Sequence, residues 1–414
     1  MLKVVIIGGG FAGVNAAKAL KYTDVEILLL DRTNYHLFQP LLYQVATSSL
    51  SPSNIASPLR EIFCNQSNVA VVMANVVKIE TQKKQLTAED GQTFSYDYLI
   101  VAPGARHSYF GHEQWEGEAP GLKTIMDASR IRERLLMAFE RAERCEDLEK
   151  AQKYLNFAIV GGGPTGVETA GSIAEFAHQT LRKNFRRIKP ESSKIYLIEG
   201  AGQLLPSFPK KLADRAKLDL EQMGVTVLLN SSVTDVTSEG LYLKDHFLDA
   251  PTIIWAAGNT ASPLLKTLNT ALDNRGRVIV HPDLSIPNHP EVFVVGDAAA
   301  CNDKNGNVLP AIAPVAIQQG KYVAKIIKKH IPEESRTHFS YFDKGMVATI
   351  GRGRAVVLFR KIQFTGFFAW LVWGVIHIFY LISFKNRLLV MMLWIFLYIS
   401  GSRPDRIIRH STHT

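Results

Sequence analysis

The 414-residue chain has little cysteine and no paired cysteine motif. Its three cysteines, Cys64, Cys145 and Cys301, lie far apart in the sequence. This spacing argues against a disulfide framework, a thiol-based redox centre and a cysteine zinc site, and favours a reducing compartment. With 29 glycines, 18 prolines and 47% hydrophobic residues, the composition excludes a collagen-like or disordered chain. The length predicts two to three domains with a sizeable core.

Acidic residues are scarce in the C-terminal part of the chain. From Gly351 to the end, nine basic residues accompany one acid, Asp405, so this part carries +8 of the net charge of +9. Two uncharged runs, 362–384 and 388–402, separate these charges, which is not the pattern of a nucleic-acid-binding arm. We therefore expect contact with an anionic membrane surface and no nucleic-acid partner. The nine residues are Arg352, Arg354, Arg360, Lys361, Lys385, Arg387, Arg403, Arg406 and Arg409.

The N-terminus lacks the features of a targeting segment. The apolar run from Met1 to Ile7 meets three glycines after seven residues, which is too short for the apolar region of a signal peptide. A short valine- and isoleucine-rich run that ends at a glycine turn is typical of a buried parallel strand.

A GxGxxG motif follows this strand and opens an alanine-rich helix that extends to about Tyr22. A second apolar strand, 25–30, ends at Asp31. In such a motif the glycines allow a tight turn, a close approach to a pyrophosphate and helix packing, while the acid binds a ribose. The order favours a dinucleotide-binding fold over a plain glycine turn. The motif residues are Gly8, Gly9, Gly10, Phe11, Ala12 and Gly13.

The pattern recurs after the strand 157–160, with motif glycines Gly161, Gly163 and Gly166 and a strand 194–198 that ends at Glu199. A carboxylate there suits a ribose hydroxyl and repels a 2′-phosphate, and no arginine follows to reverse this. The second site therefore predicts a preference for NADH over NADPH. The long gap before Glu199 holds a basic stretch, 182–189, which we expect to lengthen the preceding helix as a solvated helix end.

A third motif, the apolar run Phe293–Val295 followed by Gly296 and Asp297, completes a resemblance. Together with the N-terminal motif and the segment 101–104, it resembles the flavoproteins with two dinucleotide-binding domains. The resemblance implies that the first motif and Asp297 hold FAD, and that an inserted domain holds a nicotinamide nucleotide. It also assigns cofactor contacts to Arg32, Val76, Ala102, Gly258 and Ala313.

Three further segments narrow the resemblance. Residues 34–44, the run 163–168 and the run 255–258 are similar to segments of type II NADH dehydrogenases, as is the apolar, basic C-terminus. This family implies hydride transfer from NADH to non-covalently bound FAD and reduction of a membrane quinone (menaquinone or ubiquinone) without proton pumping. The implied fold is α/β, with two Rossmann-like domains for FAD and NADH and a C-terminal membrane-anchoring helical segment. We expect residues 1–120 and 255–330 to bind FAD, 121–254 to bind NADH, and 331–414 to associate with the membrane.

Glu168 is the candidate catalytic residue. By resemblance it is the carboxylate near nicotinamide and flavin, and the alternative is an acid favoured there by the helix dipole. His36 is either a flavin or quinone neighbour or a loop histidine bonded to backbone. Gln318 and Gln319 match a quinone-site pattern, although Pro314 replaces the pattern's first glutamine; alternatively they line a helix extending to Lys329. No metal-ligand cluster is evident.

The uncharged run 362–384 would be about 34 Å long as one helix, which is long enough to span a bilayer. Trp370, Trp373, Tyr380, Trp394 and Tyr398 are of the interfacial type, and residues 385–387 form a polar break. We expect monotopic attachment to the cytoplasmic face of the inner membrane, with a spanning hairpin as the alternative, and allow for a homodimer. The competing functions are a sulfide:quinone oxidoreductase, which needs paired cysteines, and a membrane-tethered flavoprotein that acts as a redox-responsive binding module.

Overall fold

The computed structural model describes residues 1–408, so Arg409 of the basic tail lies outside the described part. The chain divides into two compact units. Unit 1 comprises residues 1–37, 56–106 and 259–344, and unit 2 comprises 38–55, 107–258 and the chain from 345 onward. This division differs from the expected one. The segment 38–55 and the C-terminal part both belong to unit 2, because they pack on the helices of that unit.

Unit 1 is built on a six-stranded sheet in the order β20-β21-β9-β1-β2-β5. Strands β1 and β2 pair in parallel, as do β1 and β9, β2 and β5, and β9 and β21. Because both faces of the sheet are covered, its strands are continuous apolar runs. The strands are β1 (Leu2–Ile7), β2 (Val25–Asp31), β5 (Val69–Met73), β9 (Tyr98–Val101), β20 (Ser285–Ile286) and β21 (His289–Val294).

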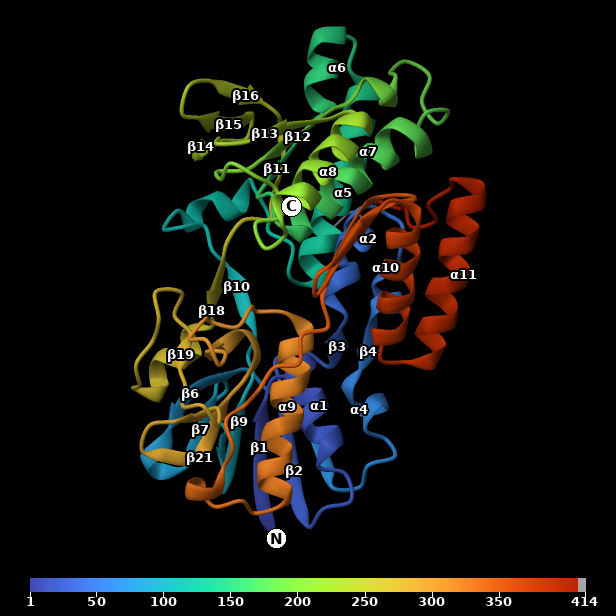
Figure 1. Ribbon diagram of the computed structural model, residues 1–414. Coiled ribbons are helices and arrows are strands. Elements are labelled where there is room, and N and C mark those ends of the chain that lie inside the picture. The colour runs from blue at the N-terminus through green and yellow to red at the C-terminus, as the bar shows by residue number, and fades with distance from the viewer. Residues whose placement is uncertain (409–414) are drawn as a thin grey trace. The chain divides into compact units, whose positions relative to one another are not determined.

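Helices α1 (Phe11–Ala19) and α9 (Ala313–Lys328) lie side by side on this sheet (Figure 1). The antiparallel sheet of β6 (Val76–Glu80), β7 (Gln85–Ala88) and β8 (Thr93–Ser95) packs its apolar residues on β1 and β9. Smaller elements complete unit 1 and its connections: β3 (Tyr35–Leu37), β4 (Ala56–Pro58), α4 (Leu59–Ile62), β10 (Ala105–His107), β18 (Asn259–Ala261), β19 (Val278–Ile279) and β22 (Ala299–Ala300).

Unit 2 contains a second parallel sheet, in the order β13-β12-β11-β17. Its strands are β11 (Asn156–Val160), β12 (Lys194–Ile198), β13 (Val225–Leu228) and β17 (Thr252–Trp255). The helices are α2 (Leu42–Ala46), α3 (Pro52–Ile55), α5 (Ile125–Arg144), α6 (Leu148–Tyr154), α7 (Pro164–Glu175) and α8 (Lys210–Gln222). A small antiparallel sheet adds β14 (Val233–Val236), β15 (Gly240–Leu243) and β16 (Phe247–Asp249).

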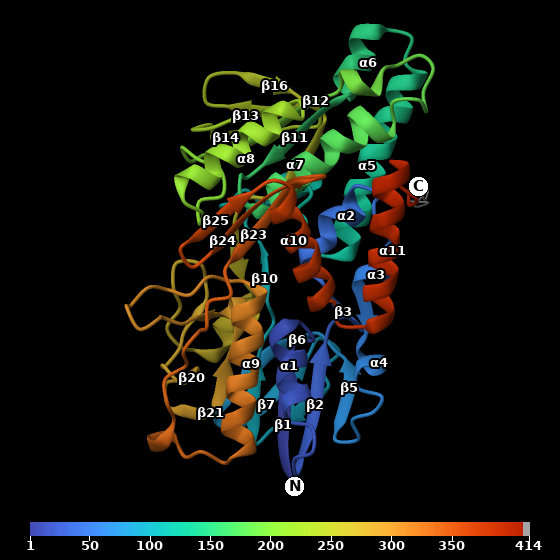
Figure 2. The same ribbon diagram turned by 45° about the vertical axis from the view of Figure 1, so that its right-hand side comes forward.

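The C-terminal part of unit 2 is an antiparallel sheet followed by two helices (Figure 2). The sheet consists of β23 (Met346–Gly351), β24 (Arg354–Phe359) and β25 (Ile362–Thr365), and the helices are α10 (Phe367–Tyr380) and α11 (Phe384–Ser400). The expected single helix over 362–384 is therefore wrong. Its first four residues pair with β24, and Gly366, at φ +81°, redirects the chain into α10. Within residues 1–408, no helix has the length and apolarity that crossing a membrane requires.

Two further expectations about local structure are wrong. Helix α7 ends at Glu175, a short π-helical turn (Phe176–Thr180) follows, and the basic stretch 182–189 is not helical. Instead, the Glu143 carboxylate accepts hydrogen bonds from three consecutive backbone N–H groups, those of residues 186–188. The polar residues 385–387 lie in the first turn of α11 rather than between the helices, and the connection is the three-residue loop 381–383.

Candidate functional site

In unit 1 the first glycine motif forms a tight turn between β1 and α1. Gly8 has φ +103°, and a Cβ atom there would lie 2.2 Å from the carbonyl oxygen of Ala102. A Cβ at Gly13 would lie 1.9 Å from the carbonyl oxygen of Gly8, so the helix can begin here only with glycine. Around Gly10 the space is open, and no side chain caps α1. The first-turn N–H groups of α1 therefore offer the cradle that a pyrophosphate needs.

The acid at the end of β2 is fixed by this turn. The carboxylate of Asp31 accepts hydrogen bonds from the backbone N–H groups of Gly9, at 2.5 Å, and Thr33, at 2.7 Å. Arg32 follows it directly. The N–H of Ala74 donates to the carbonyl oxygen of Asp31, which places Val76, the first residue of β6, near the same strand end.

The late Gly-Asp motif completes this side of unit 1. Gly296 has φ +70°, and its N–H donates to the side-chain oxygen of the buried Gln319 at 2.6 Å. Asp297 therefore lies in a short turn after β21, close to the beginnings of α1 and α9. The two helices can approach closely because residue 320 is a glycine. A Cβ atom there would lie 2.3 Å from the carbonyl oxygen of Ala12. Ala313 is the first residue of α9, whose first turn tolerates Pro314 because an N–H is not needed there.

In unit 1, the side chains of two polar candidate residues are hydrogen-bonded to backbone groups. The Nδ1 atom of the buried His36 lies 2.9 Å from the carbonyl oxygen of Gly9, and burial lowers the pKa of its imidazole. The Gln318 amide donates to the carbonyl oxygen of Phe342 and accepts from its N–H, at 3.0 and 2.9 Å. These bonds match the structural alternatives, which were a loop histidine bonded to backbone for His36 and a residue that lines a helix for Gln318.

The second motif, in unit 2, repeats the geometry of the first. Gly161 has φ +108°, and a Cβ at Gly166 would lie 1.7 Å from the carbonyl oxygen of Gly161. Gly163 is open, like Gly10. The Glu199 carboxylate accepts from the N–H groups of Gly162, at 2.6 Å, and Ala201, at 2.7 Å. Gly258, at φ +69°, ends the connection after β17.

Glu168 lies on the face of α7 that β23 covers. Gly171 makes this packing possible, because a Cβ there would lie 1.7 Å from the carbonyl oxygen of Ile350. Only 9% of Glu168 is exposed. Burial raises the pKa of its carboxyl to about 8, and a backbone hydrogen bond at Thr349 opposes this shift. A helix-dipole acid on the surface would not carry such a pKa. The catalytic role of Glu168 stays a prediction.

A small cavity of about 30 Å³, large enough for water, adjoins this carboxyl. One wall is a hydrogen-bonded series from α11 to α2: the Trp394 indole donates to Gln44, and Gln44 donates to the Tyr43 hydroxyl, at 2.7 and 3.1 Å. Burial, with the nearby Glu168 charge, raises the pKa of Tyr43 well above its usual value. The cavity is lined by Tyr43, Gln44, Ser49, Glu168, Ser172, Glu175, Thr349, Ile350, Gly351, Arg352, Trp370, Trp373, Trp394, Leu397, Tyr398 and Arg403.

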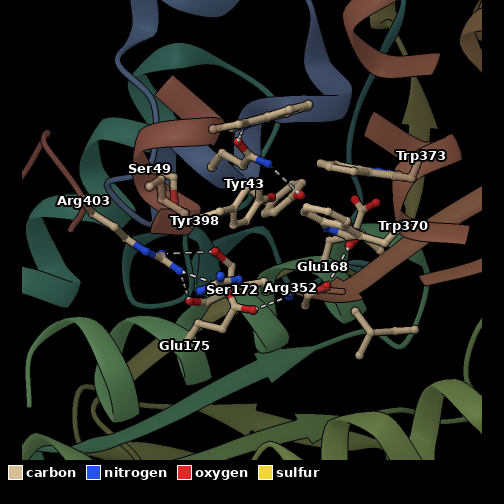
Figure 3. Close-up of a pocket in the computed structure, with 16 residues that line it drawn as sticks. Tyr43, Ser49, Glu168, Ser172, Glu175, Arg352, Trp370, Trp373, Tyr398 and Arg403 are labelled. Carbon is tan, nitrogen blue, oxygen red and sulfur yellow. Dashed lines mark hydrogen bonds and ion pairs between the residues drawn. The ribbon is translucent and has the colours of Figure 1, made fainter. Parts of the chain in front are cut away.

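Arg403 closes the cavity from the side opposite Trp370 and Trp373 (Figure 3). Its buried guanidinium donates to the carbonyl oxygens of Thr47 and Ser172, at 2.7 and 3.0 Å, and pairs with the Glu175 carboxylate at 3.4 Å. Burial raises the pKa of Glu175, although Arg403 opposes the shift. The sequence reasoning placed Arg403 among the membrane-facing charges, and it missed Glu175. The available signal was the spacing, because residues seven apart on a helix share a face.

The aromatic residues of the C-terminal helices are of two kinds. Trp373 and Trp394 are 1% and 6% exposed and stack on each other at 5.0 Å between ring centroids. Their assignment as interfacial residues is therefore wrong. Trp370, Tyr380 and Tyr398 are partly exposed.

The three cysteines are free, as expected. Cys301 is buried, and burial raises the pKa of its thiol to about 11, so it is a poor nucleophile. Among residues 1–408, no group of histidine, cysteine and acidic side chains is arranged to hold a metal ion.

Similarity to known proteins identifies the family. The chain is 45% identical to the type II NADH:quinone oxidoreductase Ndh of Mycobacterium tuberculosis, over 97% of this chain and 89% of that protein. A second enzyme of that organism, the type II NADH:quinone oxidoreductase NdhA, is 43% identical over 98% of this chain and 89% of its own length. The chain belongs to the type II NADH:quinone oxidoreductases. Residues 2–320 of this family member also match the broader pyridine nucleotide-disulphide oxidoreductase family.

Solved structures show the same fold. The structure of NDH2 from Plasmodium falciparum in complex with NADH aligns with a TM-score of 0.90, at 22% identity, over 98% of this chain and 99% of that one. The sulfide:quinone oxidoreductase of Aquifex aeolicus aligns with a TM-score of 0.77, at 17% identity, over 94% and 92%. At such identities the likeness concerns the fold alone. The expected α/β architecture and the expected family are confirmed, while the individual site residues remain predictions.

Proposed function

We propose that the protein oxidises NADH and reduces a quinone through FAD. The overall reaction converts NADH, a proton and a quinone to NAD⁺ and a quinol. The observation that carries the proposal is the buried Glu168 carboxyl, which lies beside a cavity on the first helix of a nucleotide-binding fold. Membership of the NADH:quinone oxidoreductases supports this assignment.

The residues of unit 1 fit FAD. The turn Gly8–Gly13 and the first N–H groups of α1 would hold its pyrophosphate, and Asp31 its ribose. Asp297, with the beginning of α9, would contact the ribityl chain. When bound, FAD would supply the two-electron redox chemistry that connects NADH oxidation to quinone reduction. We propose Gln319 as the residue that positions the Gly296–Asp297 turn, rather than as a quinone contact.

The second motif would bind NADH. Its open position, Gly163, permits the backbone to approach a pyrophosphate, and Glu199 would accept hydrogen bonds from the adenosine ribose. The same carboxylate would repel a 2′-phosphate, which supports a preference for NADH over NADPH.

Glu168 would supply a proton. The hydride brings one proton to the quinol, so a second must come from the protein or from solvent. A carboxyl with a pKa of about 8 is protonated at neutral pH and can donate that proton. The adjoining cavity has room for a water molecule, which would return the proton to the carboxyl. Because the chain resembles type II NADH dehydrogenases, we also propose that the reaction is not coupled to proton pumping.

We further propose that α10 and α11 attach the protein to the cytoplasmic face of the inner membrane as a monotopic anchor. Both helices expose large apolar residues, which include Phe368 at 74%, Phe379 at 67% and Ile399 at 83%. Such faces, next to basic residues, suit an anionic leaflet. Deleting the chain from Gln363 onward would also remove buried core, such as Trp373, so surface substitutions are the better test. Phe368→Asn with Phe379→Asn should release the protein from vesicles while flavin content is kept.

We also allow for a homodimer, and propose that it would bury these same apolar faces. Analytical ultracentrifugation in detergent separates the two, because the double variant would then dissociate a dimer. We propose no nucleic-acid partner.

The decisive experiment is an anaerobic flavin spectrum. NADH should bleach the flavin absorbance, and a quinone analogue should restore it within the turnover time. Bleaching by sulfide but not by NADH would favour the sulfide:quinone oxidoreductase alternative. Bleaching that no quinone reverses would favour the redox-responsive binding module.

A further inference from the structure

Helix α7 carries a second acid beside the cavity, and the proposed reaction does not use it. Glu175 follows Glu168 by seven residues, which is two helical turns, so both side chains lie on one face of α7. Both residues line the same cavity. Their backbone positions are about 10.5 Å apart along the helix axis, because each residue adds about 1.5 Å.

The strand β23 and the turn after it are bonded to both carboxyls. The Glu168 carboxyl is bonded at the backbone of Thr349, and the Glu175 carboxylate accepts a hydrogen bond from the N–H of Arg352. Three residues of a strand span about 10 Å, which agrees with the spacing on the helix. Residues 349–352 all line the cavity. The cavity therefore extends along the strand between the two carboxyls.

This cavity has room for about two water molecules, since its volume is about 30 Å³ and one water needs about 10–15 Å³. Two waters between two carboxyls form a series of hydrogen bonds that covers about 8 Å. The Ser172 hydroxyl, which lies between the carboxyls on α7, is not a free relay. It donates to the Thr47 hydroxyl at 2.7 Å, because Thr47 gives its own proton to the carbonyl oxygen of Tyr43. Water is therefore the route that can carry a proton along the cavity.

The Glu175 end of the cavity is the end nearer to solvent. The Glu175 side chain is 17% exposed, and Arg352, whose N–H it accepts from, is an exposed residue. At the Glu168 end, Thr349 is only 5% exposed. A proton that enters from solvent would therefore reach Glu175 before Glu168.

The charges around Glu175 oppose its burial. Burial raises the pKa of its carboxyl, whereas three arginines favour the carboxylate and so lower the pKa. Figure 3 shows Arg403 next to Glu175 and away from Glu168. The opposing effects make both forms of the Glu175 carboxyl accessible. The titratable groups that face it are Arg403 of the tail, Arg352 and Arg354 of the β23–β24 hairpin, Tyr398 of α11 and Tyr43 of α2.

We propose that Glu175 takes up protons from solvent and returns them to Glu168 through water in the cavity. In each turnover Glu168 gives one proton to the quinol and is left as a carboxylate. Glu175 then gives its proton to the nearest water, the last water gives a proton to Glu168, and solvent restores the proton of Glu175. One proton is thus taken up for each NADH, as the overall reaction requires. The inference rests on the proposed function, with Glu168 as its proton donor.

The experiment uses the full-length, FAD-loaded protein at neutral pH, where the Glu168 carboxyl is protonated at the start. Glu175→Gln is mixed with NADH and an excess of a quinone analogue in a stopped-flow instrument. The first quinol per flavin should form at the wild-type rate, because Glu168 already holds its proton. Later turnovers should be about 10²-fold slower, because a positioned proton-transfer group is missing. The result is a burst of one quinol per flavin, whereas Glu168→Gln should slow the first turnover as well.

Two further variants separate this role from a structural one. Glu175→Gln with Arg403→Met should give the same burst, and it leaves no unpaired guanidinium that would destabilise the fold. Asp219→Asn is the matched control, because Asp219 is buried and paired with Arg215 at 3.0 Å but does not line the cavity. It should turn over without a burst. Ferricyanide reduction by NADH takes up no proton, so it should be equal in these variants and verifies folding.

Continuous turnover of Glu175→Gln at the wild-type rate would overturn the inference. A first turnover slowed as much as the later ones, or a burst in Asp219→Asn, would overturn it as well. Failure of the proposed function is distinguishable from these results. In that case NADH would bleach the flavin of the wild type, and no quinone would restore its absorbance.

Discussion

The two glycine motifs have the same turn and differ in the helix that follows. In both turns, a Cβ atom on the last motif glycine would lie within 2 Å of the carbonyl oxygen of the first motif glycine. In both, the acid at the end of the second strand accepts a hydrogen bond from a backbone N–H of the motif. Where α1 meets α9 it carries Ala12, whereas α7 carries Glu168, Ser172 and Glu175 along the cavity. The turn alone thus provides for nucleotide binding. The covering element decides whether an acid on the helix is buried, and burial is what raises the pKa of the Glu168 carboxyl.

The largest expected effect comes from closing either turn. Gly13→Ala should abolish FAD retention, because the added methyl group would collide with the carbonyl oxygen of Gly8. Gly166→Ala makes the same collision in the other unit and should keep FAD but lose NADH-driven turnover. Flavin released on denaturation and stopped-flow bleaching by NADH measure the two effects. Gly117→Ala, with no neighbour within 4 Å, is the control. Full FAD retention in Gly13→Ala would break the comparison.

Glu168→Gln should slow quinone reduction by about 10²–10⁴-fold while FAD stays bound, since a positioned proton donor contributes this much. Wild-type turnover should also fall as pH rises through about 8, where the carboxyl loses its proton. The variant should lack that limb of the profile. Steady-state rates against pH test both points, with the exposed Glu149→Gln as control. An unchanged profile in Glu168→Gln would return the residue to a structural role.

Arg403→Met should destabilise the protein by about 3–5 kcal/mol, because it leaves the Glu175 carboxyl buried without its partner. Adding Glu175→Gln should restore part of the loss. Chemical denaturation of unit 2, followed by tryptophan fluorescence, reports it. Arg106→Met removes an exposed guanidinium and should cost little. If Arg403→Met were as stable as Arg106→Met, the buried pair of Arg403 and Glu175 would contribute nothing to stability.

The raised pKa of Glu168 predicts a pH dependence of stability. Between about pH 4.5 and 8 the folded chain keeps a proton that the unfolded chain releases, so rising pH favours unfolding by up to a few kcal/mol. The melting temperature of the wild type should therefore fall more steeply over this range than that of Glu168→Gln. Parallel curves would contradict the buried, protonated carboxyl.

The smallest effect concerns nucleotide choice. Glu199→Ala should narrow the preference for NADH over NADPH by about tenfold, because a charge-assisted hydrogen bond and a repulsion are both lost. The ratio of the kcat/KM values for NADH and NADPH measures this preference. As a control in the other motif, Asp31→Ala should weaken FAD binding and leave the preference unchanged. Equal use of both nucleotides by the wild type would remove Glu199 from the site.

The sequence by itself determined both nucleotide folds, nearly to the residue in β1, β2, β11 and β12. It could do so because a glycine turn with an apolar strand on each side is specified by local sterics and pattern. It also pointed to Glu168, through its distance from Gly166. It did not determine whether the runs 362–384 and 388–402 face lipid or protein, since apolarity is the same for both.

Only the tertiary structure decided that Trp373 and Trp394 are buried and that Arg403 pairs with Glu175, 228 residues away. It also decided that the segment 38–55 joins the second unit. These features depend on contacts between distant parts of the chain, and burial sets the protonation of a carboxyl only once those contacts exist. The nucleotide-binding turns can therefore be predicted from the sequence, whereas the cavity beside the protonated Glu168 carboxyl depends on tertiary packing.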